Sequence, residues 1–171
     1  IAHSINSFVR KGVFSYGDSA VLYRTNAQSR LLEERFVREN IPYKIVGGVN
    51  FYARKEIKDL LCYLKTIDNA QDDLAVKRII NVPKRGIGAT TIAKVQDYAD
   101  ENGMSFYAAL RQAEEISTLS KATATKIRPF VTFIQMLRSK LPYISVEQLM
   151  DEIIEDTGYV AELDAEGTDE A

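Results

Sequence analysis

Residues 78–95 read RIINVPKRGIGATTIAKV, and this stretch predicts two helices joined by a Gly-Ile-Gly turn. The first helix is expected over residues 74–81, because Pro83 cannot continue a helix. The second is expected over residues 89–101, where Asn102-Gly103 ends it. Helical spacing of apolar residues recurs on both sides of this pair and predicts further helices at residues 56–68, 105–112, 121–140 and 145–156, the last with a capping box at Ser145. The downstream part is therefore expected to be all-helical.

The turn itself has the features of a phosphate contact. Small glycines let a phosphate approach the backbone, the isoleucine anchors the turn, and the next helix presents free N–H groups. Residues 74–96 contain five basic residues and no carboxylate. Such a helix-hairpin-helix element would hold a nucleic acid backbone without reading bases. The alternative is a plain tight turn. The candidate contacts are Lys84, Arg85, Gly86, Ile87, Gly88 and Thr90.

Upstream, the pattern predicts a strand-helix-strand unit. Short apolar runs at residues 20–23 and 43–46 flank an amphipathic helix, which is the usual unit of a parallel α/β sheet. Arg24 and Asn26 follow the first strand, at the sheet edge where ligands bind. They could hold phosphates of a nucleic acid strand. Spacing alone favours the alternative, in which Asn26 caps the helix and Arg24 pairs with an acid such as Glu33.

A second motif spans residues 47–59, GGVNFYARKEIKD. Phe51 and Tyr52 precede three basic residues, and aromatic side chains beside cations can stack bases and bind phosphates. Packing between subdomains is the commoner role of such an aromatic pair. The sequence leaves both interpretations open.

Composition excludes several kinds of chemistry. The chain has one histidine, His3, and one cysteine, Cys62, so neither a Cys/His zinc site nor an internal disulfide is expected. Cys62 is expected to be a buried structural residue. Residues 142–171 contain ten acidic and no basic residues, which leaves an excess of eight positive charges in residues 1–141. A polyanionic partner for the basic part is one interpretation, and solvated helix faces are the other.

Three strings, taken together and in order, resemble one family. YRTNAQSR (residues 23–30), IPYKIVGGVNFYARKEIKDLL (41–61) and RIINVPKRGIGATTIAKV (78–95) resemble superfamily 1A DNA helicases of the PcrA/UvrD/Rep family, most closely its PcrA branch. Residues 145–159 continue the resemblance loosely. It implies an internal fragment of a longer chain, as does a first residue that is not Met. Residues 1–54 would be a partial RecA-like sheet of subdomain 2A, and residues 55–171 a helical subdomain 2B truncated at its C-terminus.

The resemblance also implies a function. Family members are ATP-driven motors that move 3′ to 5′ on single-stranded DNA and unwind the duplex ahead. In that family the Arg and Asn of the first string contact the single strand, which implies Arg24 and Asn26 here. The Gly-Ile-Gly turn contacts the duplex backbone. ATP and Mg²⁺ are expected to bind elsewhere in the parent protein. This chain has no phosphate loop, so no catalytic residue, no metal and no ATPase activity are expected of it alone.

Two alternatives come from other classes of protein. One is a stand-alone helix-hairpin-helix DNA-binding module, although such a module would need no strand-helix-strand start. The other is a protein-interaction domain in which the acidic helices from Ser145 onward bind a basic partner. With no signal peptide and no apolar run of membrane-spanning length, a cytoplasmic protein with no membrane contact is expected.

Overall fold

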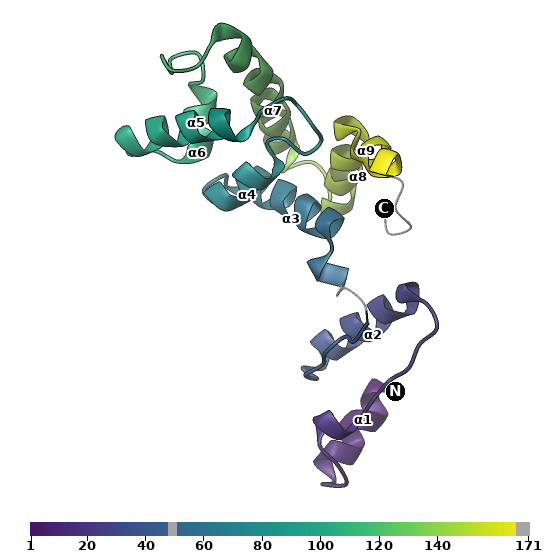
Figure 1. The fold of residues 1–171 in the computed structure, drawn as a ribbon. Coiled ribbons are helices and arrows are strands. Elements are labelled where there is room, and N and C mark those ends of the chain that lie inside the picture. Colours follow the sequence, from purple (N-terminus) through teal and green to yellow (C-terminus); the bar gives the residue numbers. More distant parts are fainter. Residues whose placement is uncertain (48–50, 167–171) are drawn as a thin grey trace. The chain divides into compact units, whose positions relative to one another are not determined.

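A computed structural model describes residues 1–47 and 51–166 of the chain, apart from the side chains of Asn26, Ala27 and Glu166. Every regular element in this part is helical (Figure 1). The chain divides into two compact units, Ile1–Ile57 and Lys58–Ala171, and each is described by itself. Within the described residues, no helix is both long and apolar enough to cross a membrane.

The first unit holds two helices, α1 (Ala2–Arg10) and α2 (Asn26–Arg38), which pack against each other. Short 3₁₀ turns lie at Tyr16–Asp18, between the two helices, and at Phe51–Ala53, after α2. Its described hydrophobic core is small, with Ala2, Phe36 and Ile41 as the buried residues. The unit is therefore held together by few apolar contacts.

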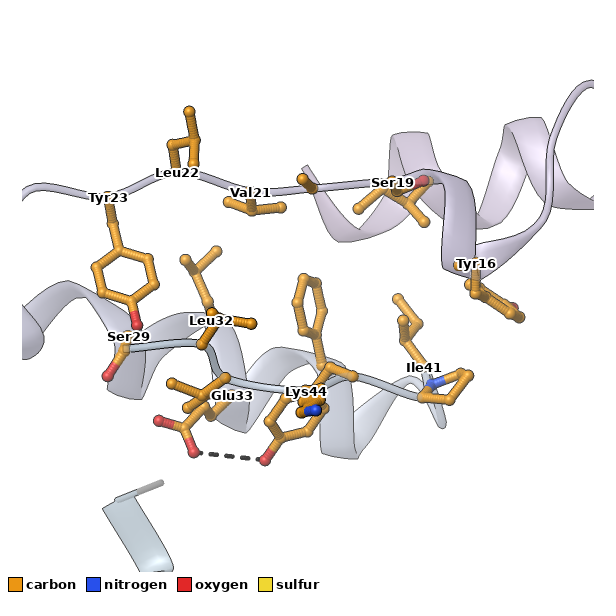
Figure 2. Close-up of a pocket in the computed structure, with 18 residues that line it drawn as sticks. Tyr16, Ser19, Val21, Leu22, Tyr23, Ser29, Leu32, Glu33, Ile41 and Lys44 are labelled. Atoms are coloured by element: carbon orange, nitrogen blue, oxygen red, sulfur yellow. Dashed lines mark hydrogen bonds between the residues drawn. The ribbon is translucent and has the colours of Figure 1, made fainter. Parts of the chain in front are cut away.

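The predicted α/β fragment with a partial RecA-like sheet is wrong for this structure. Residues 20–23 and 43–46 run without helical structure, as the apolar runs suggested, but neither forms a strand in the described part of the chain. A strand is defined by hydrogen bonds to a neighbouring strand. In Figure 2 these two segments border an apolar pocket that lies between them, so they do not pair with each other. Local sequence specified extended backbone but could not supply the pairing.

The second unit contains seven helices among its described residues: α3 (Lys55–Asp68, which begins in the first unit), α4 (Asp73–Ile79), α5 (Ala89–Glu101), α6 (Phe106–Arg111), α7 (Lys121–Lys140), α8 (Val146–Thr157) and α9 (Tyr159–Glu166). Helix α6 packs against α4, α5 and α7, and α8 pairs with α9 (Figure 1). Their inward faces form one continuous core that includes Tyr63, Phe106, Ile127 and Ile134. The expectation of a helical downstream part is confirmed.

Sequence patterns placed most of these helices closely. Helices α5 and α7 have the predicted bounds, and the capping box of Ser145 and Gln148 is present at the start of α8. Helix α9 was not predicted, since the expected series of helices ended at residue 156. Gly158 does end α8, with a left-handed φ of 69°, but the chain then starts another helix.

A buried polar contact explains where α9 sits. The Tyr159 hydroxyl donates to Asp59 Oδ2 at 2.6 Å, and Arg78 Nε donates to Asp59 Oδ1 at the same distance. Asp59 is only 2% exposed, so its carboxylate needs both donors. One buried carboxylate thus joins α3, α4 and α9.

Candidate nucleic-acid interface

The Gly-Ile-Gly turn between α4 and α5 is held in shape by a side chain that precedes it. Asn81 Oδ1 accepts hydrogen bonds from the backbone N–H of Arg85 at 2.8 Å and of Ile87 at 3.1 Å. Gly86, between them, has a left-handed φ of 69°, which glycine adopts readily and which strains most other residues. Ile87 is 1% exposed and anchors the turn in the core, as predicted. Asn81 was missed by the sequence analysis.

Arg85 faces the inside of the turn. Its guanidinium donates to the carbonyls of Ile79, Ile80 and Pro83 at 3.1–3.3 Å, and to the Tyr63 hydroxyl at 2.7 Å. The guanidinium also lies 5.4 Å from the centre of the Phe130 ring. These contacts satisfy carbonyls near the end of α4, which helix geometry leaves without partners. Arg85 thus shapes the turn, a role that residue type and spacing could not distinguish from phosphate binding.

Tyr63 completes this inner layer. Its hydroxyl accepts from Arg85 and donates to the Val82 carbonyl at 2.5 Å. Burial raises the pKa of Tyr63 above its ordinary value, and the neighbouring Arg85 charge opposes that shift only in part. The phenol therefore keeps the proton that it donates.

The outer face of the turn is open to solvent. Lys84, Gly86, Gly88 and Thr90 are all exposed. Gly88 is the N-cap of α5 and has no side chain to accept from the first N–H groups of that helix. These groups and the helix dipole favour an anion at this position. The structure thus separates the six predicted contacts into four on the surface and two, Arg85 and Ile87, that hold the turn from within.

One acidic side chain reaches this face. Glu162 of α9 accepts a hydrogen bond from the backbone N–H of Lys84 at 2.7 Å. Sequence reasoning could not have found it, because the two residues are 78 positions apart. The Glu162 carboxylate thus occupies one backbone donor of this face and places a negative charge beside it.

Arg24 lies just before α2 in the first unit. Its backbone N–H donates to Gln28 Oε1 at 3.0 Å, and its side chain is exposed. The predicted alternative, a pair with Glu33, is not formed: Glu33 is 2% exposed and accepts from Phe51 N–H and the Tyr43 hydroxyl. Thr25, not Asn26, is the N-cap of α2, and the Asn26 side chain lies outside the described residues. No described residue pairs with the Arg24 guanidinium.

The aromatic pair of the second motif is in contact with cations of its own chain. Arg30 lies 4.7 Å and Arg54 5.7 Å from the centre of the Phe51 ring. Tyr52 meets Phe51 edge-on at 5.3 Å and remains 46% exposed. These contacts favour packing over base stacking for Phe51.

A pocket of about 560 Å³ in the first unit is a poor candidate for a functional site. Residues 19–23 form one side and residues 41–46 the other, with α2 beneath (Figure 2). Its lining is mostly apolar, and its carboxylate, Glu33, already accepts hydrogen bonds from Tyr43 and Phe51. The pocket therefore lacks the convergent polar groups that orient a bound small molecule.

Neither a metal centre nor a reactive thiol emerges from the described residues. They contain no cluster of three or more side chains suited to hold a metal ion. Cys62 is partly buried against the core of the second unit. Burial raises the pKa of its thiol, which disfavours the reactive thiolate.

Known proteins resemble this chain over most of its length. The model for the UvrD-like helicase C-terminal domain matches residues 1–158. The ATP-dependent DNA helicase PcrA of Staphylococcus aureus strain Mu50 is 48% identical over 153 residues, which cover 90% of this chain and 21% of that protein. PcrA of Staphylococcus epidermidis strain RP62A is 48% identical over 151 residues, covering 88% and 21%. This chain thus spans about a fifth of the length of these relatives.

The match extends across both compact units. A stand-alone helix-hairpin-helix module would account for the second unit only, so that alternative is not supported. The chain belongs to the family of UvrD-like helicase C-terminal domains.

Proposed function

We propose that this chain is a DNA-binding part of an ATP-dependent DNA helicase that moves 3′ to 5′ and works in the cytoplasm. Family membership and the 48%-identical helicases support this activity. Residues 1–54 would correspond to the start of subdomain 2A and residues 55–171 to subdomain 2B. ATP and Mg²⁺ would bind other parts of the protein, since the described residues offer no metal cluster. The acidic segment from Ser145 onward remains a predicted contact for a basic protein partner.

The observation that carries the proposal is the two-sided construction of the Gly-Ile-Gly turn. On the inside, Asn81, Arg85 and Ile87 hold the backbone in place. On the outside, a phosphate would meet Lys84, two bare glycines and the N-terminal donors of α5, with Thr90 in the first turn of that helix. A preorganised set of backbone donors binds phosphate with little ordering cost and reads no base edge. We therefore assign duplex backbone contact to this face.

The single-strand contact is assigned to Arg24 and Asn26. Arg24 is exposed just before α2, and its guanidinium has no partner among the described residues. Arginine binds phosphate in a bidentate manner and keeps its charge at any physiological pH. Asn26 enters the proposal through the family resemblance alone.

Gly88 offers the sharpest test of the duplex contact. A Cβ added at Gly88 would meet nothing within 4 Å, and the backbone there is extended with φ −88° and ψ 174°, so Gly88→Val should fold. Its side chain would stand where the phosphate must approach. We expect Gly88→Val to weaken duplex binding strongly, and Lys84→Ala to lower the slope of log affinity against log salt by about 1.

The measurement is duplex affinity over a salt series, with circular dichroism as the control for folding. Duplexes of unrelated sequence should give equal results, because no base is read. If both folded variants bind duplex as wild type does, the turn is only structural and the proposed contact is wrong.

A further inference from the structure

A lysine from a distant helix lies across the Gly-Ile-Gly turn. A Cβ built on Gly86 would fall 3.4 Å from Lys126 Nζ, 3.8 Å from its Cδ and 3.9 Å from its Cε. The aliphatic stem of Lys126 thus passes the bare face of Gly86, and its ammonium ends beside the turn. Lys126 is exposed, so the ammonium also faces solvent.

The packing of α7 explains this position. Phe130, one helical turn further along α7, is 1% exposed and lies under the Arg85 guanidinium. Residues four apart share one face of a helix. The face of α7 that packs Phe130 against Arg85 therefore also places Lys126 at the surface of the turn. Ile127, fully buried beside it, fixes the rotation of the helix.

The charge of Lys126 is not neutralised by the chain itself. Arg128, its nearest cationic neighbour on α7, pairs with Glu114, and the Lys94 ammonium donates to the Thr118 carbonyl. Among the described residues Lys126 has neither an ion pair nor a hydrogen-bond partner. The acid at the turn, Glu162, is bound to the backbone of Lys84.

We infer that Lys126 is a second phosphate-binding cation of this turn. An anion bound at the turn could then meet two exposed lysines, Lys84 from the turn itself and Lys126 from α7. The duplex contact would then be built from two segments of the chain, the α4–α5 turn and helix α7. This inference rests on the proposed duplex contact and adds a residue to it.

Lys126→Ala tests the inference, with Lys140→Ala as the control for charge, although Lys140 is paired with Glu152 at 2.7 Å and its variant also loses that ion pair. Lys140 is on the same helix, and fourteen residues at about 1.5 Å each place it roughly 21 Å away. We expect Lys126→Ala to lower the salt slope of duplex binding by about 1, so that over a roughly fourfold rise in salt the affinity falls about 4-fold less than for wild type. Lys126→Arg should keep the wild-type slope. Lys140→Ala should keep it as well.

The outcomes distinguish a failure of the Lys126 inference from a failure of the proposed duplex contact. If Lys84→Ala lowers the slope but Lys126→Ala does not, the inference about Lys126 is overturned and the proposed contact stands. If neither variant changes the slope, or wild type shows no salt-dependent duplex binding, both are overturned. An equal drop in Lys140→Ala would mean that the effect is one of general charge, which also overturns the assignment.

Discussion

The two compact units differ sharply in how they are stabilised. The second buries a continuous core of aromatic and aliphatic residues, whereas the buried hydrophobic core described in the first consists of Ala2, Phe36 and Ile41. The first also leaves Leu22 95% and Val46 86% exposed. Small units bury too little surface to be stable alone. The second unit is therefore expected to supply most of the folding free energy.

The same contrast holds for the two proposed DNA contacts. The turn of the second unit is fixed by the hydrogen bonds of Asn81 and Arg85 and by the buried Ile87. Arg24 in the first unit has only a backbone hydrogen bond to Gln28 nearby. A contact built on a rigid frame binds with less loss of conformational entropy. Duplex binding should thus depend on folding of the second unit alone.

The largest expected effect is on the free energy of unfolding, when one core residue is replaced in each unit. Phe106→Ala in the second unit removes a fully buried ring and should lower the free energy of unfolding by about 3–5 kcal/mol. Phe36→Ala removes a ring from the small core of the first unit and should change the main unfolding transition far less. Urea denaturation followed by circular dichroism measures both. Equal losses would show that the units unfold as one.

A smaller effect is expected from the inner layer of the turn. Arg85→Ala leaves carbonyls of Ile79, Ile80 and Pro83 without their donor, and should cost about 1–3 kcal/mol of stability. Arg85→Lys should not restore it, because a single ammonium cannot reproduce the planar set of donors. Lys84→Ala should leave stability unchanged.

Thermal unfolding of these three variants, read beside their duplex salt slopes, separates the roles. If Arg85→Ala keeps full stability and lowers the slope as Lys84→Ala does, Arg85 binds phosphate directly and our structural assignment is wrong.

The smallest expected effect concerns Arg24. Arg24→Ala combined with Asn26→Ala should weaken single-strand binding and lower its salt slope by about 0.7 for the lost arginine. Stability should change by less than about 0.5 kcal/mol, because the arginine is exposed. Arg38→Ala, at the other end of α2 about 18 Å away, is the control. Fluorescence titration measures the affinity of each variant for single-stranded DNA. Unchanged affinity in the double variant would refute the contact.

Local sequence was sufficient for most of the helices and for the turn. Apolar spacing located α5 and α7, capping residues located the start of α8, and the Gly-Ile-Gly string identified the buried Ile87. These features depend on residues within one or two helical turns of each other. The same reasoning failed for residues 20–23 and 43–46, where it predicted strands.

The sequence by itself determined most of the helical segments, the basic stretch without carboxylates around the turn, and the family to which the strings belong. Only the tertiary structure decided that Arg85 faces inward, that Asp59 is buried beneath a tyrosine 100 residues away, and that Glu162 and Lys126 reach the turn. The physical reason is the distance along the chain over which each kind of interaction acts. Helix periodicity and capping act between near neighbours, whereas burial, hydrogen-bond partners and charge at a site depend on which distant segments pack together.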